Sequence, residues 1–181
     1  MNTYFTADTH FGHANIIRYC NRPFKGVYDM DDTQCNNWNA TVGPEDTVYH
    51  LGDFSFGLPD KYLARLNGRI FFVFGNHDRE MKRVKQEKKW NHKVTWLPDL
   101  AEVEVEGQKI VLCHYAMLVW NKSHHNTWHL YGHSHGSLPD NPQSNSFDVG
   151  VDCWNYYPVS FSEVAAKMAK KSWKPLDHHG A

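Results

Sequence analysis

The chain has 181 residues, a length that suits one domain and allows a substantial buried core. Its apolar share of 41% is ordinary for a globular protein and argues against intrinsic disorder. The net charge of −1 excludes a basic field over the whole molecule, so composition gives no argument for nucleic-acid binding.

The N-terminal segment and the cysteines bear on where the protein works. The first ten residues lack a basic region followed by an apolar run, so we expect no signal peptide, and no apolar run has the length of a membrane span. The four cysteines are widely spaced without a C-x-x-C pair, which favours reduced thiols over a zinc knuckle. We therefore expect a cytoplasmic protein without membrane association or an obligate protein partner.

The first half of the chain alternates short apolar strands with helices. Each predicted strand is rich in β-branched or aromatic residues and stops at a polar residue or a glycine. These strands cover 3–7, 47–51 and 69–74. Helices are predicted between them from apolar spacing, and Pro59 marks one helix start. The helices cover 13–20, 31–40 and 59–66.

The second half is charged at first and then mostly strand. Residues 79–93 form a charge run, which predicts either a solvated helix face or a polyanion-binding edge. Alternation on both sides of Gly107 predicts a hairpin. The predicted strands cover 94–97, 101–106, 108–113, 127–131 and 147–151. A final helix is predicted over 160–171, where Ser160 and Glu163 have capping-box spacing. The pattern predicts one layered α/β domain over residues 1–181.

Ligand-type side chains occur directly after the predicted strands. Five strand ends carry them, and sites in α/β proteins collect at the carboxyl ends of strands. Glycines precede three of these positions, which permits tight turns and close backbone approach. The candidate metal ligands are Asp8, His10, Asp53, Asn76, His114, His133 and His135. Histidine is the commonest protein metal ligand, so the spacing indicates a shared metal site.

These residues fall into five blocks, D-x-H, G-D, G-N-H-D, a lone histidine and G-H-x-H, in that order between Asp8 and His135. The set resembles the calcineurin-like metallophosphoesterase superfamily, particularly its small bacterial and phage-type members. A lone D-x-H or G-D is weak, whereas G-N-H-D together with G-H-x-H is specific. The resemblance implies a four-layer α/β/β/α sandwich, in which two facing mixed sheets are flanked by helices.

The resemblance also implies a role for each residue. Asp8, His10 and His135 would hold one metal ion. Asn76, His114 and His133 would hold a second, and Asp53 would bridge both. His77 would stay off the metals and protonate the leaving oxygen, or stabilise charge on the phosphoryl group. Asp78 would orient His77.

The ligand chemistry agrees with this assignment. Mixed nitrogen and oxygen ligands suit transition metals better than Mg²⁺ or Ca²⁺, and we expect manganese first, with iron, zinc, nickel or cobalt as alternatives. Two such ions clamp the attacking and leaving oxygens of an in-line displacement and lower the pKa of a bridging water, which yields hydroxide. Two carboxylates against two divalent ions leave the site positive, so it attracts a phosphate ester.

We therefore expect a hydrolase of phosphoric esters, with phosphodiesters preferred over monoesters because an uncapped site is open on two sides. The substrate would be a small phosphate ester or a nucleotide. Two alternatives remain: a nuclease acting on DNA or RNA, which the charge run favours and the neutral net charge opposes, and a non-catalytic interaction module on the same fold.

Other aromatic and histidine residues have less specific interpretations. His13 lies close to the site and is expected to cap or pack. His50, inside a predicted strand, is expected to be a core histidine or to support the ligands. His124 and His125 are expected in a solvated loop. The cluster of Trp154, Tyr156 and Tyr157 favours core packing, with stacking on a nucleobase as the alternative.

Overall fold

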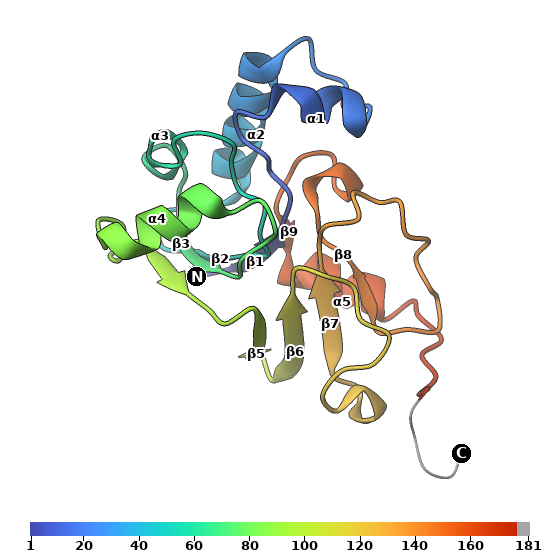
Figure 1. Ribbon diagram of the computed structural model, residues 1–181. Helices are drawn as coiled ribbons and strands as arrows, with labels where there is room; N and C mark the ends of the chain where they lie inside the picture. Colours follow the sequence, from blue (N-terminus) through green and yellow to red (C-terminus); the bar gives the residue numbers. More distant parts are fainter. Residues whose placement is uncertain (177–181) are drawn as a thin grey trace.

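Two mixed β-sheets form the centre of the molecule (Figure 1). The computed structural model describes residues 1–176. The first sheet has the order β4-β3-β2-β1-β9, in which β1 to β4 are parallel and β9 is antiparallel to β1. Its strands are β1 (Thr3–Thr6), β2 (Thr47–His50), β3 (Arg69–Phe72), β4 (Val94–Trp96) and β9 (Val159–Ser160). The carboxyl ends of three neighbouring parallel strands, β1 to β3, therefore meet at one edge.

The second sheet has the order β5-β6-β7-β8. A hairpin pairs β5 with β6 in antiparallel fashion, and β6, β7 and β8 run parallel. Its strands are β5 (Leu100–Val105), β6 (Gln108–Cys113), β7 (Trp128–Tyr131) and β8 (Ser146–Asp148). A bridge between Ala7 and Gly150 joins the two sheets beside the end of β1. That bridge brings the loops after β1 and β8 together.

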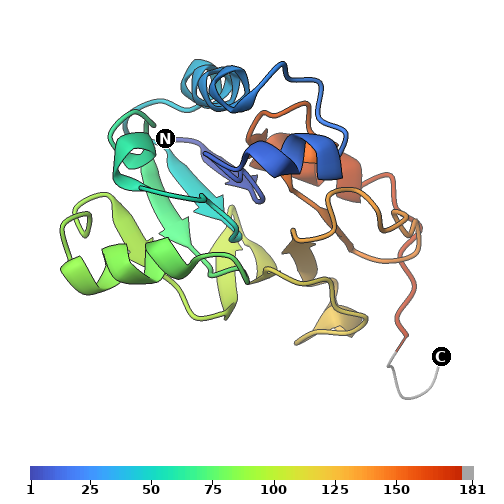
Figure 2. The ribbon, with the colours of Figure 1, turned by 45° about the horizontal axis from the view of Figure 1, so that its top comes forward.

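Helices flank the sheets. Figures 1 and 2 show α2, α3 and α4 along the outer side of the first sheet, away from the second sheet. The helices are α1 (Ala14–Tyr19), α2 (Val27–Thr41), α3 (Asp60–Leu63), α4 (Arg79–Glu87) and α5 (Phe161–Met168), with short 3₁₀ turns at Ser123–His125 and Val151–Cys153. Ser160 and Glu163 form the expected capping box at the start of α5.

Two apolar clusters hold these layers together. One contains Trp38, Tyr62 and Met81 from the helices and Phe72 from the first sheet. The other lies between the sheets. It includes Phe5, Leu51, Ile110, Leu130 and, from α5, Val164. The alternation of side chains along β1 and β2 of the first sheet supplies one face to each cluster, whereas the second sheet contributes to the inter-sheet cluster. The expected class, two mixed sheets flanked by helices, is confirmed.

Most predicted elements match the observed ones to within two residues, but α3, β8 and α5 each end three residues before the predicted end. Two further differences have physical reasons. Helix α2 begins at Val27, four residues before the predicted start, because its N-cap residue Gly26 has no side chain that could mark the start by capping. Strand β9 has two residues, too few for an alternating pattern. Within residues 1–176, no helix has the length and apolarity needed to cross a membrane.

Candidate metal centre

The backbone at the predicted ligands is held in an uncommon conformation. Five of the seven candidate ligands have a positive φ: Asp8 (58°), His10 (48°), Asp53 (57°), His133 (67°) and His135 (47°). The left-handed region is sparsely populated by residues other than glycine and costs of order 1–3 kcal/mol for each. Strain of this kind persists only where surrounding contacts impose it, and it clusters at functional sites.

Two of the glycines predicted to support the ligands lie where no side chain fits. Gly52 has a φ of 94°, and a Cβ there would lie 2.4 Å from the backbone nitrogen of Gly75. A Cβ on Gly132 would lie 2.7 Å from Asp8 Oδ2. These contacts let the turns after β2, β3 and β7 approach one another and the Asp8 carboxylate. The predicted close backbone approach is confirmed at both positions.

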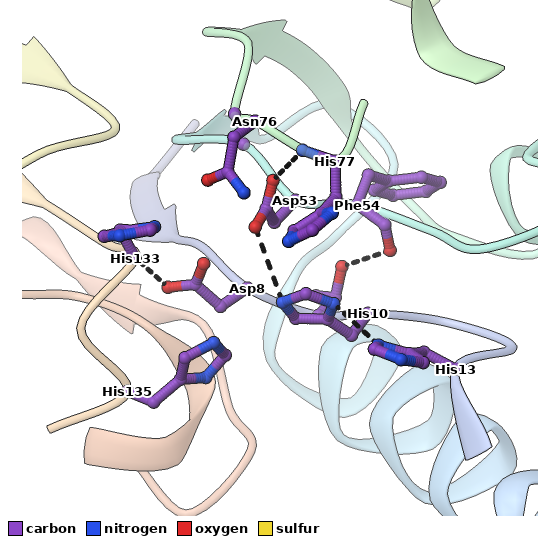
Figure 3. A network of polar contacts seen from close by, with 12 residues as sticks. Asp8, His10, His13, Asp53, Phe54, Asn76, His77, His133 and His135 are labelled. Atoms are coloured by element: carbon purple, nitrogen blue, oxygen red, sulfur yellow. Dashed lines mark hydrogen bonds and ion pairs between the residues drawn. The ribbon is translucent and has the colours of Figure 1, made fainter. Parts of the chain in front are cut away.

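Three candidate ligands from the ends of β1 and β7 form the first half-site, Asp8, His10 and His135. One ligand atom from each lies within 4.8 Å of the others. Asp8 is fully buried, and its Oδ2 accepts a hydrogen bond of 2.8 Å from the backbone N–H of His133. Its Oδ1 is buried without a hydrogen-bond partner among the described residues, as is Nε2 of His10. Figure 3 shows Asp8 lying between His133 and His135.

The second half-site consists of Asn76, His114 and His133. The buried His114 ring places Nδ1 2.7 Å from the carbonyl oxygen of Leu51. A carbonyl only accepts, so Nδ1 carries the proton and Nε2 keeps its lone pair. That Nε2 lies 3.1 Å from Asn76 Oδ1, and the rings of His114 and His133 have centroids 5.1 Å apart.

Asp53 stands between the two half-sites. Its Oδ2 lies 3.6 Å from Nε2 of His10 and also 3.6 Å from Nε2 of His114. Its ligand atom also falls within 4.8 Å of those of His114 and His133. The other oxygen, Oδ1, accepts a hydrogen bond of 2.8 Å from the backbone N–H of His77. The carboxylate therefore has one oxygen fixed by the β3 turn and one facing both half-sites (Figure 3).

The electrostatics of this arrangement fit a pair of cations. Burial, followed by the charges of Asp148 and Asp53, raises the pKa of Asp8 well above its usual value. Burial lowers the pKa of His10 and of His114, so both rings are neutral. The Asp8 carboxylate is therefore costly to ionise on its own, and each neutral imidazole offers a lone pair. A cation at each half-site satisfies these electron pairs, and the donor set of carboxylate, amide and imidazole suits transition metals.

Asp78 acts on backbone rather than on the His77 ring. Its side chain is buried, and its two oxygens accept hydrogen bonds of 2.7, 2.9 and 2.7 Å from the backbone N–H groups of Asp53, Phe54 and Gly75. Among residues 1–176, no hydrogen bond to the His77 ring is found for it. Both oxygens join the turns after β2 and β3, so Asp78 can orient His77 only through the backbone of the turn that carries it.

The His77 ring lies at the exposed mouth of the centre. It faces the space beside Asp53 and His10 (Figure 3), with centroids 6.0 Å from His10 and 5.2 Å from Phe56. Phe56 stacks on His13 at 3.8 Å, and His13 Nδ1 lies 3.3 Å from Nδ1 of His10. His13 therefore packs beside the site and holds the His10 ring, in line with its expected packing role.

The comparisons with known proteins address this centre. A family model described as the calcineurin-like phosphoesterase superfamily domain matches residues 1–146, which include both half-sites, Asp53 and His77. The chain belongs to this superfamily. The expected family is therefore confirmed, and the protein is a phosphoesterase by family.

Relatives of this calcineurin-like phosphoesterase come from archaea, bacteria and phages. The uncharacterized protein MJ1445 of Methanocaldococcus jannaschii is 35% identical over 178 residues, covering 93% of this chain and 91% of that protein. The gene 66 protein of Mycobacterium phage D29 is 27% identical over 182 residues, covering 85% and 89%. These matches extend over nearly the whole lengths of both proteins.

Solved structures share the fold. The structure of AQ665 from Aquifex aeolicus, a protein of unknown function, aligns with a TM-score of 0.68 at 27% identity, covering 91% of this chain and 98% of that chain. A structure of an archaeal phosphodiesterase aligns with a TM-score of 0.51 at 21% identity, covering 83% and 82%. The second likeness shows the shared phosphoesterase fold.

Three charged residues that surround the first half-site were not among the predicted site residues. Asp152 Oδ2 lies 2.7 Å from His135 Nδ1, and the buried Arg22 pairs with Asp152 at 2.7 Å. Asp148 accepts hydrogen bonds from the backbone N–H groups of Gly150 and Gly136. Asp148 and Asp152 follow the ligand blocks in the segment DVGVD, and this pair of closely spaced carboxylates could have indicated further site residues. Arg22 carried no signal, because a single arginine in a polar loop is ordinary.

The remaining side chains singled out in this phosphoesterase have mostly supporting roles. His50 is buried, with Nε2 3.1 Å from Thr9 Oγ1 and Nδ1 accepting from the Gly52 N–H, as expected for a supporting histidine. Trp154 donates to the Asp148 carbonyl, and the Tyr156 ring packs on Phe24. Packing thus accounts for these two aromatic residues, whereas Tyr157 is exposed.

Proposed function

We propose that this phosphoesterase is a dinuclear-metal-dependent hydrolase of phosphoric esters, built as one domain over residues 1–181. The position of Asp53 carries the proposal. One carboxylate oxygen lies at equal distances of 3.6 Å from the Nε2 atoms of His10 and His114, one in each half-site. A carboxylate between two groups of ligand-type side chains is the arrangement expected of a residue shared by two cations.

The residues of the two half-sites would hold the ions. Asp8, His10 and His135 would hold one, and Asn76, His114 and His133 the other, with Asp53 shared. When bound, two such cations acidify a water molecule and neutralise charge on the phosphoryl group. Manganese is the first expectation, with iron, zinc, nickel or cobalt as alternatives, because the donors mix nitrogen with oxygen.

His77 would supply the proton for the leaving oxygen. Its ring is exposed, faces the centre and lies beside the half-sites without belonging to either ligand group (Figure 3). Its backbone N–H is held by Asp53, and the turn that carries it is held by Asp78. The protein thus positions His77 through the backbone, and the ring is free to meet the substrate.

The open mouth favours a phosphodiester over a monoester. Asn76, His77 and His133 are all exposed, so a phosphoryl group at the centre has room for an ester group on either side. A small phosphate ester or a nucleotide is the substrate class that fits. The net charge of the whole chain is −1, so attraction of the substrate depends on the occupied centre.

Nucleic acid is a second candidate substrate, favoured by exposed cations on α4. Arg79, Lys82 and Lys85 are exposed, and α4 begins directly after Asp78. Arg83 instead forms ion pairs with neighbouring carboxylates and is less available. A nuclease predicts single-stranded substrate binding that weakens steeply with salt, whereas a small-ester hydrolase predicts little salt dependence.

The deciding experiment combines elemental analysis with a grid of metals and substrates. Chelator-treated protein is reloaded with Mn²⁺, Fe²⁺, Zn²⁺, Ni²⁺, Co²⁺ or Mg²⁺ and assayed with a chromogenic phosphodiester, a chromogenic monoester and a labelled oligonucleotide. We expect two bound ions per chain and turnover of the diester above that of the monoester. A folded protein that binds fewer than two ions, or turns over no ester with any metal, contradicts the proposal and favours an interaction module.

A further inference from the structure

The Arg22 guanidinium lies behind the first half-site with every donor engaged. Its Nε and Nη2 donate to Oδ1 and Oδ2 of Asp152 at 2.8 and 2.7 Å. Nη2 also donates to the carbonyl of Asp8 at 2.8 Å, and Nη1 donates to the carbonyl of Thr9 at 3.2 Å and to Met30 Sδ at 3.5 Å. The side chain is fully buried. Arginine offers five N–H groups in a rigid fork, and all five have acceptors here.

Through these bonds one side chain joins the two chain segments of the first half-site. The Asp8 and Thr9 carbonyls belong to the turn whose φ angles at Asp8 and His10 are positive. Asp152 belongs to the 3₁₀ turn after β8, more than a hundred residues away. Arg22 therefore supplies contacts that can hold the strained turn, and it fixes the distance from that turn to Asp152.

Asp152 in turn sets the orientation and tautomer of His135. Its Oδ2 lies 2.7 Å from His135 Nδ1. Both oxygens of Asp152 also accept hydrogen bonds from Arg22, so Asp152 acts as an acceptor toward His135 as well. His135 Nδ1 therefore donates and Nε2 keeps its lone pair. Nε2 is then the atom that His135 offers to the group it forms with Asp8 and His10.

A separate metal site that includes Asp152 is less consistent with the contacts. Cys20, His135 and Asp152 also have ligand atoms within 4.8 Å of one another. A cation there would compete with the Arg22 fork, which occupies both Asp152 oxygens, and would meet its positive charge. Burial also raises the pKa of the Cys20 thiol to about 11, which disfavours the thiolate that metals require. Asp152 thus acts as an acceptor for two side chains.

We propose that Arg22 and Asp152 are positioning residues for the first half-site and that they set its affinity for a cation without affecting the second. The inference rests on the proposed function. The second half-site has separate support, because the Leu51 carbonyl fixes His114. Loss of a group that orients a metal-binding histidine typically costs 10–100-fold in metal affinity. We expect a loss of that size, confined to one of two binding classes.

Calorimetric titration of chelator-treated protein with Mn²⁺ tests this, using Asp152→Asn as the gentlest change and Arg22→Lys as the second. Asparagine keeps the shape of Asp152 but places an N–H₂ group against a donor, and lysine keeps the Arg22 charge without the fork. His114→Ala identifies the class that belongs to the second half-site. Asp152→Asn and Arg22→Lys should each weaken the binding class of the first half-site by 10–100-fold. Electron paramagnetic resonance should show an isolated Mn²⁺ ion where the unaltered protein shows a coupled pair.

Double variants separate positioning from general damage. Adding Asp152→Asn to Asp8→Ala should cause no further loss of Mn²⁺ affinity, because both substitutions act on the first half-site. Adding Asp152→Asn to His114→Ala should weaken Mn²⁺ binding in both classes. The exposed pair of Arg65 and Asp32, 2.7 Å apart, offers matched controls. Asp32→Asn and Arg65→Lys should leave both classes unchanged.

Three results would overturn the inference. They are unchanged Mn²⁺ binding in Asp152→Asn, weakening of the His114 class instead, and equal weakening of both classes. Thermal unfolding in chelator shows whether each variant is folded, and a folded Asp152→Asn protein alone suffices for the decision. If the unaltered protein itself binds no pair of Mn²⁺ ions, the proposed function fails instead, so the two failures are distinguishable.

Discussion

The two half-sites of the centre are built in different ways. In the first, Asp8 and His10 are at most 2% exposed, and charged side chains stand behind the ligands. In the second, Asn76 and His133 are exposed, and His114 is supported by a backbone carbonyl. One half is enclosed before any ion arrives, whereas the other opens to solvent. If both half-sites bind cations as proposed, the difference predicts a tightly held ion in the first and an exchangeable, substrate-facing ion in the second.

The Asp53 side chain belongs to both halves, so its loss should have the largest effect. Asp53→Ala removes the oxygen shared by His10 and His114, and we expect both Mn²⁺ classes to weaken and kcat/KM to fall by at least about 10³-fold, ~4 kcal/mol of transition-state stabilisation. Elemental analysis and steady-state kinetics measure the two effects. An Asp53→Ala protein that keeps a coupled pair of ions would show that the halves are independent.

Substitution of His77 should impair catalysis without affecting metal binding in either half-site. His77→Ala should keep both ions, because its backbone N–H still reaches Asp53 Oδ1, and should lose roughly 10²–10⁴-fold in kcat with a poor leaving group. The loss should shrink for a nitrophenolate ester, whose leaving group needs no proton. Kinetics with two esters of different leaving-group pKa measure this. A His77→Ala protein without its ions would mean that the residue is a ligand.

Chelator should reveal the asymmetry between the halves directly. We expect two steps of Mn²⁺ release that differ by at least about 10-fold in chelator concentration, with the exposed second half-site emptied first. Activity should vanish with the first step, since the proposed reaction needs both ions. Metal content and activity are followed together through the titration. His133→Ala should show only the tighter step, and simultaneous release of both ions would remove the distinction between the halves.

The convergence of the candidate ligands could be predicted from the sequence, because each ligand follows the end of a strand and these strand ends lie together. All seven candidate ligands, Asp53 among them, converge as the strand pattern predicted. The side chains that hold these ligands in place could not be predicted. Arg22 reaches Asp152 across 130 positions, and no local periodicity encodes such a contact. The positive φ angles are likewise consequences of turns that pack against each other, and the modest preference of aspartate and histidine for this region does not say which positions adopt it.

The same contrast between local pattern and distant contact explains which parts of the fold could be predicted. Strands such as β6, whose apolar residues pack between the sheets, were predicted at their observed bounds. The short strand β9 depends on its pairing with Phe5 of β1, a contact formed only after the chain returns. The contacts of Asp78 could not be predicted for the same reason. Its sequence neighbour His77 suggested a side-chain pair, whereas the fold brings three backbone amides within reach.

The enclosed half-site should carry a stability cost that its ion removes. Asp8 is buried beside Asp148 and Asp53, and the pKa of Asp8 is raised. A carboxyl whose folded pKa is raised destabilises the fold increasingly as pH rises from the unfolded value of roughly 4 to the folded pKa, and the fold regains this stability as pH falls. In chelator at neutral pH, Asp8→Asn should therefore raise the unfolding free energy by ~1–3 kcal/mol. With saturating Mn²⁺ the order should reverse, because binding stabilises the unaltered protein more. Thermal unfolding in both conditions provides the test.

The smallest effect is expected at Asp60, which lies in α3 outside both half-sites. Hydrogen bonds from Lys89 and Trp90 lower its pKa to about 2. A lowered carboxyl pKa stabilises the fold above the unfolded value of roughly 4 and ceases to do so as pH falls toward 2. The side chain is 26% exposed, so solvent screening limits the contribution to less than about 1 kcal/mol. Asp60→Asn should thus lower stability slightly at pH 7, converge with the unaltered protein in acid, and leave both Mn²⁺ classes unchanged. A change in either class would mean that the halves depend on the outer helices as well as on the buried charges behind them.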